Sequence, residues 1–401
     1  MNHDEYKITQ AVYVHIPFCR QKCLYCDFAS YAGYSEQQMT DYVEAVCAEI
    51  EGRAAEGKNV AEKATIYFGG GTPSTLPTNS LAKIVHSLKA AGFWRNPTEA
   101  TIEVNPGTAD LEKLCFYRNL GFDRISFGVQ SLNDTELKTI GRIHSAADAL
   151  EAIQLAKDAG FKRISADLIY GLPGQTLASL KGTLEQFLAT GLEHMSVYGL
   201  IVEEGTPLER LVESGKLVLP DEDTSADMYE LVQAMLKKAG FQRYEISNYA
   251  KNNQCSRHNL VYWQYHPYAA FGAAAVGFDG CVRRGAVEQV LPYIKGVLDL
   301  YGAEALTDKD RQKAYEALYT EEMLTKEELF GEFMFMGLRR AQGADLKEAQ
   351  ERFGINVWER YEKELRPLVE HGLLVYDKEN ASLRLTESGM AVGNQIFEIF
   401  L

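Results

Sequence analysis

Short apolar runs alternate with amphipathic stretches of helical periodicity from residue 11 to about residue 200, and this alternation restricts the possible folds more than any other feature. The runs that predict strands are, in chain order, residues 11–16, 63–70, 101–106, 124–129, 163–172 and 194–200. About six strand-then-helix units imply an α/β fold with parallel strands and right-handed crossovers, either a barrel or a doubly wound sheet. In both, functional side chains lie on loops at the carboxyl ends of the strands.

The pattern changes after Pro207. A further helix is predicted over residues 221–240, followed by a strand-like segment and an aromatic, Gly- and Ala-rich stretch over 258–280. From about residue 310 long helices precede a strand pair within 371–389, which predicts a small, mostly helical, winged-helix-like domain. Many such domains bind DNA, but residues 321–401 hold 16 acidic and 10 basic side chains. This balance favours a structural appendage or lid.

The charge balance limits the partners that we expect. The chain has 41 Lys and Arg against 56 Asp and Glu, a formal net charge of −15, which gives no global attraction to nucleic acid or anionic lipid. No uncharged apolar run is long enough to span a membrane, and the first ten residues are polar with no apolar signal core. We therefore expect a cytoplasmic protein, a monomer or homodimer, without nucleic acid and with at most peripheral membrane contact.

Three of the seven cysteines fall within eight residues, with the spacing C-x3-C-x2-C: Cys19, Cys23 and Cys26. Three thiolates can hold three corners of a [4Fe–4S] cluster and leave the fourth iron open to a small molecule, which is the interpretation that we favour. A zinc site would need His15, Asp27 or a distant residue as a fourth ligand. Three packed cysteines without a metal are the remaining alternative.

This cysteine spacing at the end of the first predicted strand resembles the signature of the radical S-adenosylmethionine (SAM) enzymes. The resemblance implies a partial (β/α)6, TIM-like barrel in which SAM binds the open iron and is cleaved to a 5′-deoxyadenosyl radical by the reduced cluster. Six segments in order resemble those of the HemN/HemW family, which includes the oxygen-independent coproporphyrinogen III oxidases: YVHIPFC, GGGTPS, EVNPGT, SFGVQS, GRIHS and DLIYGLPGQT.

The resemblance covers roughly residues 11–280, and the C-terminal part resembles the small domain that follows in the same family. It implies three domains. We expect a radical SAM partial barrel over 1–205, a completion of the barrel that carries a haem motif over 206–305, and a HemN-type winged-helix-like domain over 306–401.

Several residues at the predicted strand ends suit a ligand. Glycine lets the backbone approach closely, carboxylates suit ribose hydroxyls or an ammonium, and Arg142 offers a planar fork for a carboxylate. The resemblance assigns ten residues to SAM binding: Tyr13, Tyr25, Gly69, Gly70, Gly71, Thr72, Glu103, Gln130, Arg142 and Asp167. It assigns the cluster to Cys19, Cys23 and Cys26.

Two departures distinguish the branches of this family. The oxidases carry a fourth cysteine two residues after the third, where this sequence has Phe28, and they have a longer segment before the cluster motif than the 18 residues found here. Both departures speak against oxidase activity, and Phe28 in the segment CDFAS resembles the HemW branch.

A segment near residue 260 resembles the HNxxYW motif associated with haem in HemW proteins, formed here by His258, Asn259, Tyr262 and Trp263. Histidine is a good axial ligand for haem iron, and the aromatic rings offer flat apolar surface to a porphyrin. Val276 stands where the family commonly has a histidine, with His266 and Tyr268 nearby.

The resemblance therefore implies a haem chaperone with a [4Fe–4S] cluster and SAM, which carries haem or porphyrin as cargo to apo-haemoproteins. One alternative is an enzyme that decarboxylates coproporphyrinogen III by radical chemistry. Others are a different porphyrin-modifying radical SAM enzyme and a binding module without redox chemistry. SAM cleavage is compatible with the first three of these four functions.

Overall fold

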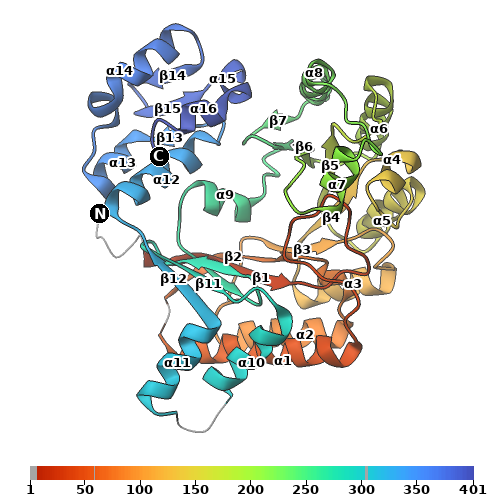
Figure 1. Cartoon of the computed structure of the whole chain (residues 1–401), viewed down its shortest axis with the longest axis vertical. Helices are drawn as coiled ribbons and strands as arrows, with labels where there is room; N and C mark the ends of the chain where they lie inside the picture. The colour runs from red at the N-terminus through yellow and green to blue at the C-terminus, as the bar shows by residue number, and fades with distance from the viewer. Residues whose placement is uncertain (1–6, 58, 303–305) are drawn as a thin grey trace.

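The computed structural model describes residues 7–57, 59–302 and 306–401. Residues 1–6 of the predicted first domain and 303–305 at the end of the predicted second domain lie outside the described residues. The described strands form one 12-stranded sheet and one 3-stranded sheet, surrounded by helices (Figure 1).

Six adjacent strands of the large sheet are parallel. They are β1 (Thr9–Ile16), β2 (Val60–Gly70), β3 (Ala100–Val104), β4 (Arg124–Gln130), β5 (Arg163–Tyr170) and β6 (His194–Gly199). The helices between and after them are α1 (Glu36–Ala55), a short 3-10 turn (Pro73–Thr75), α2 (Thr78–Ala90), α3 (Leu111–Leu120), α4 (Asp134–Thr139), α5 (Ala146–Asp158) and α6 (Leu177–Ala189). Each strand agrees with a predicted run to within a few residues, which confirms the α/β fold.

The crossover helices decide between the two predicted architectures. Helix α1 packs on α2, α2 on α3, and α3 on α5, so these helices cover one face of the sheet in succession. A doubly wound sheet carries its helices on both faces. The arrangement is therefore a partial barrel, with its crossover helices outside (Figure 1).

Further strands extend the sheet at both edges. At the β6 edge, β8 (Asn248–Ala250) and β7 (Gln242–Arg243) add antiparallel. At the β1 edge, β9 (Tyr268–Phe271) adds parallel and leads to β10 (Val276–Phe278), β11 (Val282–Ala286) and β12 (Tyr319–Met323). The accompanying helices are α7 (Pro207–Glu213), α8 (Glu222–Lys238), α9 (Arg257–Trp263), α10 (Val290–Tyr301) and α11 (Asp308–Leu318).

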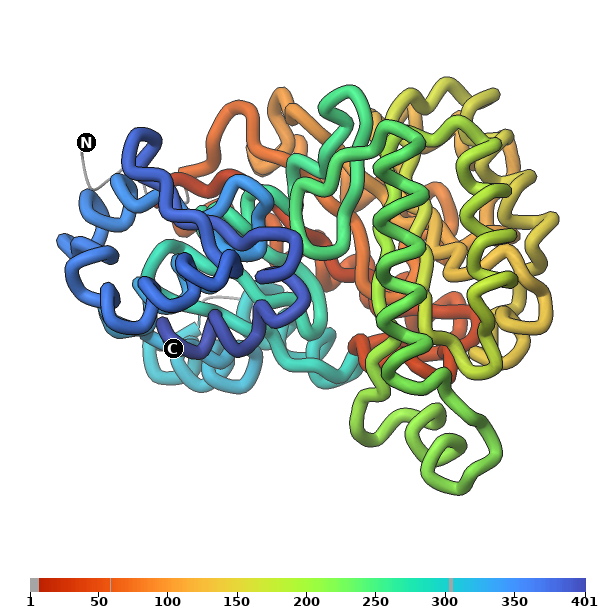
Figure 2. The backbone as a smooth tube through the Cα atoms, turned by 90° about the horizontal axis from the view of Figure 1, so that it is seen from above, coloured from red at the N-terminus to blue at the C-terminus, as the bar shows by residue number. Residues whose placement is uncertain are grey.

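The C-terminal part packs around a second hydrophobic core, to which Tyr265 and Phe278 also contribute. Its elements are α12 (Lys326–Leu338), β13 (Ala344–Asp345), α13 (Leu346–Phe353), α14 (Val357–Glu370), β14 (Leu374–Asp377), β15 (Ser382–Leu385), α15 (Glu387–Ala391) and α16 (Gly393–Phe397). The predicted strand pair is the antiparallel hairpin β14–β15, and β13 adds to β15. In Figure 2 this C-terminal part (blue) and helices α4–α6 (yellow to green) lie at opposite ends of the molecule.

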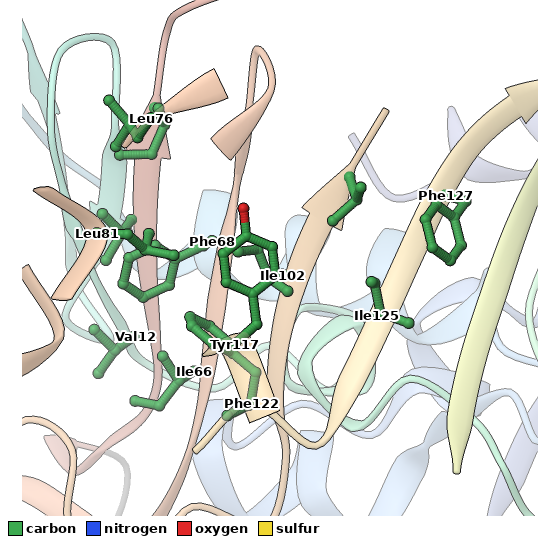
Figure 3. Packing of buried hydrophobic residues seen from close by; sticks show 14 of the residues in the cluster. Val12, Ile66, Phe68, Leu76, Leu81, Ile102, Tyr117, Phe122, Ile125 and Phe127 are labelled. Atoms are coloured by element: carbon green, nitrogen blue, oxygen red, sulfur yellow. The ribbon is translucent and has the colours of Figure 1, made fainter. Parts of the chain in front are cut away.

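The main core lies between the parallel strands and the outer helices. Apolar side chains of β1–β4 pack there with those of the neighbouring helices and loops (Figure 3). Phe68 on β2 contacts Phe122 edge to face, and both are fully buried. This core holds the strands in place, so the other face of the same strands is free to carry polar side chains.

Helix α9 lies on the inner side of the sheet, against β1 and β2 (Figure 1). The carboxylate of Glu99, which is completely buried, accepts hydrogen bonds from the backbone N–H groups of Arg257 (2.9 Å) and His258 (3.0 Å). Arg163 pairs with the same carboxylate at 2.7 Å. Burial raises the pKa of Glu99, but the neighbouring Arg124 and Arg163 and the two N–H groups lower it by more. Glu99 thus anchors α9 inside the barrel.

None of the helices in the described ranges is both long and apolar enough to cross a membrane.

We expect Glu99→Ala to lower the free energy of unfolding by about 3–5 kcal/mol, because it removes the buried carboxylate that pairs with Arg163 and leaves two N–H groups of α9 without their acceptor. Urea unfolding followed by circular dichroism measures this. The control Glu185→Ala removes the exposed partner of Lys181 on α6, and it should leave stability nearly unchanged. Equal losses in the two variants would contradict the anchoring role.

Candidate functional site

A cavity of about 330 Å³ opens at the carboxyl ends of the parallel strands. It is bounded by the loop after β1, by the inner faces of β2–β6 and, at one point, by α9. Twelve residues predicted to bind cluster, SAM or haem line it: Cys19, Cys23, Tyr25, Cys26, Gly70, Gly71, Thr72, Glu103, Gln130, Arg142, Asp167 and Asn259. The fold thus brings side chains from a span of about 240 residues into one place.

Five other predicted residues do not line this cavity: Tyr13, Gly69, His258, Tyr262 and Trp263. Tyr13 lies behind the cysteine loop, where its hydroxyl hydrogen-bonds His15 Nδ1 at 3.0 Å. His15 Nε2 in turn bonds the carbonyl of Ala29 at 2.9 Å, so Tyr13 and His15 support the loop from inside the barrel. Burial lowers the pKa of His15, which keeps the ring neutral.

Each of the three half-buried thiols has a polar neighbour. Cys19 Sγ lies 3.6 Å from the hydroxyl of Thr72, and Cys26 Sγ lies 3.6 Å from that of Ser30. Arg142 donates a hydrogen bond to Cys23 Sγ at 3.3 Å. Burial raises the pKa of the Cys19 thiol.

The cysteine loop is held in position from both of its flanks. The N–H of Leu24 donates to the carbonyl of Ile140 at 3.1 Å, and the carbonyl of Leu24 accepts from the N–H of Leu208 at 2.9 Å. Gln21 donates to the carbonyl of Gly141 at 3.1 Å. A short loop with this many external bonds keeps its three thiols together at the rim of the cavity.

The donor set fits an iron–sulfur cluster better than a single ion. Within the described residues, no three His, Cys, Asp or Glu side chains converge to hold one metal ion, as a zinc site requires. In a [4Fe–4S] cluster each thiolate binds a different iron, so the three sulfurs surround the group instead of converging on one point. Two buried polar atoms at this cavity, Gln130 Oε1 and Arg142 Nε, have no partner in the described structure and can serve a ligand.

The glycine run after β2 is required by close packing. A Cβ on Gly70, whose φ is +110°, would lie 2.5 Å from the His15 ring, and one on Gly71 would lie 2.9 Å from the carbonyl oxygen of Phe18. A Cβ on Gly69 would lie 3.0 Å from a carboxylate oxygen of Glu103. The run therefore lets the cysteine loop and Glu103 lie directly against the backbone of β2.

Two carboxylates face the cavity from β3 and β5, Glu103 and Asp167. Burial and the charge of Asp167 raise the pKa of Glu103 to about 7, although a 2.6 Å hydrogen bond from Tyr67 opposes the shift. Burial also raises the pKa of Asp167. Carboxyl groups with raised pKa values in a cavity mark a functional site.

Gln130 and Arg142 complete the wall. Gln130 ends β4 with a φ of +71°, next to an irregularity in the pairing of β4 with β5. A non-glycine residue in this conformation costs about 1–3 kcal/mol, and such strain is concentrated at functional sites. Arg142 donates to the side chain of Asn105 at 3.0 Å and to the carbonyl of Gly128.

His258, the predicted haem ligand on α9, is closed off in this arrangement. His258 is 1% exposed, its Nδ1 bonds the hydroxyl of Thr65 at 2.9 Å, and its Nε2 bonds the hydroxyl of Tyr262 at 2.8 Å. Burial lowers the pKa of His258 to about 3, so the ring is neutral. The guanidinium of Arg339 lies over the ring of Trp263, 4.9 Å from its centroid. Haem ligation by His258 stays a prediction, and it requires the bond to Tyr262 to open.

The cavity wall also contains residues that the sequence analysis did not single out: Tyr67, Asn105, Arg124, Ser126, Ser196 and Tyr198. All of them except Asn105, which directly follows β3, lie inside strands, where a single polar residue does not stand out. The sequence did contain a signal for them, because every second side chain of a strand points to the same face. On β4, for example, Arg124, Ser126, Gly128 and Gln130 all line the cavity.

The comparisons with known proteins agree with this geometry. The family model "Radical SAM superfamily" matches residues 13–187, and the model "HemN C-terminal domain" matches residues 324–392. The curated protein "Heme chaperone HemW" of Bacillus subtilis is 36% identical over 393 residues, which cover 98% of this chain and 99% of that protein. The protein of the same name from Lactococcus lactis is 34% identical, with 98% and 97% covered.

Two further proteins are similar to this chain. "Radical S-adenosyl methionine domain-containing protein 1, mitochondrial" of Bos taurus is 33% identical and covers 95% of this chain and 85% of that protein. The solved structure of coproporphyrinogen III oxidase (HemN) from Escherichia coli superposes with a TM-score of 0.81 over 98% of this chain and 90% of that one. At 21% identity it shows the fold alone.

The raised pKa of Glu103 predicts a pH dependence of stability. The folded chain keeps the proton of Glu103 up to about pH 7, whereas the ordinary pKa is 4.5. Between these values the folded state binds more protons than the unfolded state, so stability falls as the pH rises. We expect Glu103→Gln to stabilise the chain at pH 8 by up to about 3 kcal/mol, and by much less at pH 5.

Urea unfolding of the chain without SAM at the two pH values tests this. Glu112→Gln, on the exposed face of α3, is the matched control and should give no pH-dependent gain. The same difference between wild type and Glu103→Gln at both pH values would contradict the raised pKa.

Proposed function

The chain belongs to the radical SAM superfamily and, within it, to the HemN/HemW family, and on this premise we propose that it is a haem chaperone of the HemW type. The observation that carries the proposal is the similarity to curated HemW proteins along 98% of the chain. It is supported by Phe28, which stands where the oxidase branch has a fourth cysteine. The similarity to the solved oxidase structure supports only the fold, so we do not propose that this chain decarboxylates coproporphyrinogen III.

Membership in the superfamily implies SAM and a [4Fe–4S] cluster. We propose that Cys19, Cys23 and Cys26 hold the cluster, which together with SAM supplies one-electron chemistry when bound. The residues proposed to bind SAM are Tyr25, Gly70, Gly71, Thr72, Glu103, Gln130, Arg142 and Asp167, all at the cavity, with Gly69 and Tyr13 behind them. The unpartnered Arg142 Nε and Gln130 Oε1 are suited to the carboxylate and the ammonium of an amino acid.

Haem is the proposed cargo, apo-haemoproteins are the proposed recipients, and the cytoplasm is the proposed location. A neutral imidazole is the form of histidine that ligates iron, and burial keeps His258 neutral. We propose that α9 moves away from Thr65 on β2 and that the Tyr262 side chain turns away from His258 Nε2, with Asn259, Tyr262 and Trp263 beside the porphyrin. The division into domains 1–205, 206–305 and 306–401 is part of the same proposal, as is a monomeric or homodimeric state.

An anaerobic haem titration followed by absorbance tests the cargo. We expect saturation near one haem per chain in the cluster-reconstituted wild type, and loss of the imidazole-ligated spectrum in His258→Ala. Tyr262→Phe frees His258 Nε2 from one hydrogen bond worth about 1 kcal/mol, so haem binding should tighten about fivefold.

Circular dichroism of each variant checks folding, because His258→Ala leaves two buried hydroxyl groups without a partner. A wild type that binds no haem would overturn the chaperone. An unchanged haem spectrum in His258→Ala would show that His258 is not the iron ligand, whereas the proposal that the chain binds haem would still hold.

Iron and acid-labile sulfide analysis tests the cluster. We expect Cys19→Ala, Cys23→Ala and Cys26→Ala each to lose most of the reconstituted iron and sulfide, because each removes one ligand of the cluster. Cys115→Ala, on α3 and outside the cavity, is the matched control and should retain both. If the wild type held zinc and no acid-labile sulfide, the proposed cluster would be wrong and the alternative zinc site would be supported.

A further inference from the structure

A haem that approaches this chain does not first meet His258, which is buried. Two aromatic side chains that line the cavity are exposed instead. Phe28 and Tyr198 both line the cavity, and their exposed fractions are 71% and 41%. Large apolar rings that line a cavity and are exposed indicate a binding surface.

Phe28 is held in this exposed position. It follows Cys26 by two residues, on the loop that is fixed by Leu24 and Gln21. Its own carbonyl accepts a hydrogen bond from Lys22 Nζ at 3.0 Å, and Ser30, two residues on, is 1% exposed. The ring is therefore not free to fold back into the core.

Tyr198 reaches the same cavity from the other end of the barrel. It lies near the end of β6, the last of the six parallel strands, whereas Phe28 follows β1, the first. Both line one cavity because the sheet curls. Ile201, which is 68% exposed, continues the apolar surface just after β6.

The charges around Phe28 favour a ligand with carboxylates. Lys22 and Arg20 are exposed on the same loop, and Arg20 donates to the carbonyl of Gly107 at 3.2 Å. Asp27 is the one acidic neighbour on this stretch of the loop, so two cations face one anion in a chain whose net charge is −15. Rings for stacking beside cations match a flat, apolar macrocycle that carries propionates, which describes haem.

We propose that haem docks first at this exposed aromatic surface, with its macrocycle against Phe28 and Tyr198 and its propionates toward Lys22 and Arg20, before α9 moves to expose His258. This docking step rests on the proposed haem-chaperone function and adds a site to it. It needs no iron ligand, so a porphyrin without metal uses the same surface.

Protoporphyrin IX, which has no iron for a histidine to ligate, is the probe. We expect it to quench the fluorescence of the cluster-reconstituted wild type in a saturable way. Phe28→Ser and Tyr198→Ser should each weaken this binding about tenfold, because each removes one aromatic contact. Phe28→Tyr should restore it. Leu298→Ser, an equally polar change at an exposed apolar residue of α10 away from the cavity, is the matched control.

Iron and sulfide content is measured in each variant, so that damage to the cluster loop is recognised, and Tyr198→Ser tests the surface without touching that loop. Unchanged binding of protoporphyrin IX in both serine variants would overturn the docking site. A wild type that binds haem but not protoporphyrin IX would also overturn it and leave the chaperone intact. A wild type that binds neither would overturn both.

Discussion

Parallel pairing of β1 to β6 is the constraint on which the rest of the molecule depends. Parallel strands all end at the same edge of a sheet, so six loops and strand ends meet there however far apart they are in the sequence. The outer helices bury one face of these strands in a hydrophobic core, and the inner face carries the polar side chains of the cavity. The cysteine loop, the glycine run and both carboxylates owe their proximity to this geometry.

The cavity and the predicted haem helix α9 are linked by Tyr67 and by Asn259, which lies on α9 and lines the cavity. The hydroxyl of Tyr67 donates to Glu103 in the cavity, and the ring of Tyr67 lies 5.0 Å from the ring of His258 on α9. Glu99 holds α9 against this ring from the other end. Tyr67 therefore contacts both Glu103 in the cavity and His258 on α9, and movement of α9 away from β2 requires the packing of these rings to rearrange.

Most of the fold followed from local pattern. The strand positions were predicted because buried parallel strands are short, apolar and bounded by helical periodicity, and these signals need no information from distant residues. The choice between barrel and doubly wound sheet was open, because it depends on which face the crossover helices cover. The three cysteines and four of the predicted SAM residues, Tyr25, Gly71, Thr72 and Arg142, lie on loops, where a polar or glycine-rich segment stands out, whereas the other six predicted SAM residues lie inside strands. Tyr67 and Arg124 were missed because inside a strand an inward-facing polar residue is separated from its site partners by apolar neighbours.

The sequence by itself determined the parallel α/β architecture, the C-x3-C-x2-C donor set and the helical C-terminal part, because each depends on residues close together along the chain. The tertiary structure alone decided that His258 is buried and bonded to Thr65, which lies 193 residues away, and that Phe28 lines the cavity and is exposed. Burial and hydrogen bonding depend on which distant segments pack together. A sequence motif therefore identifies candidate side chains, and tertiary packing decides whether a ligand can reach them.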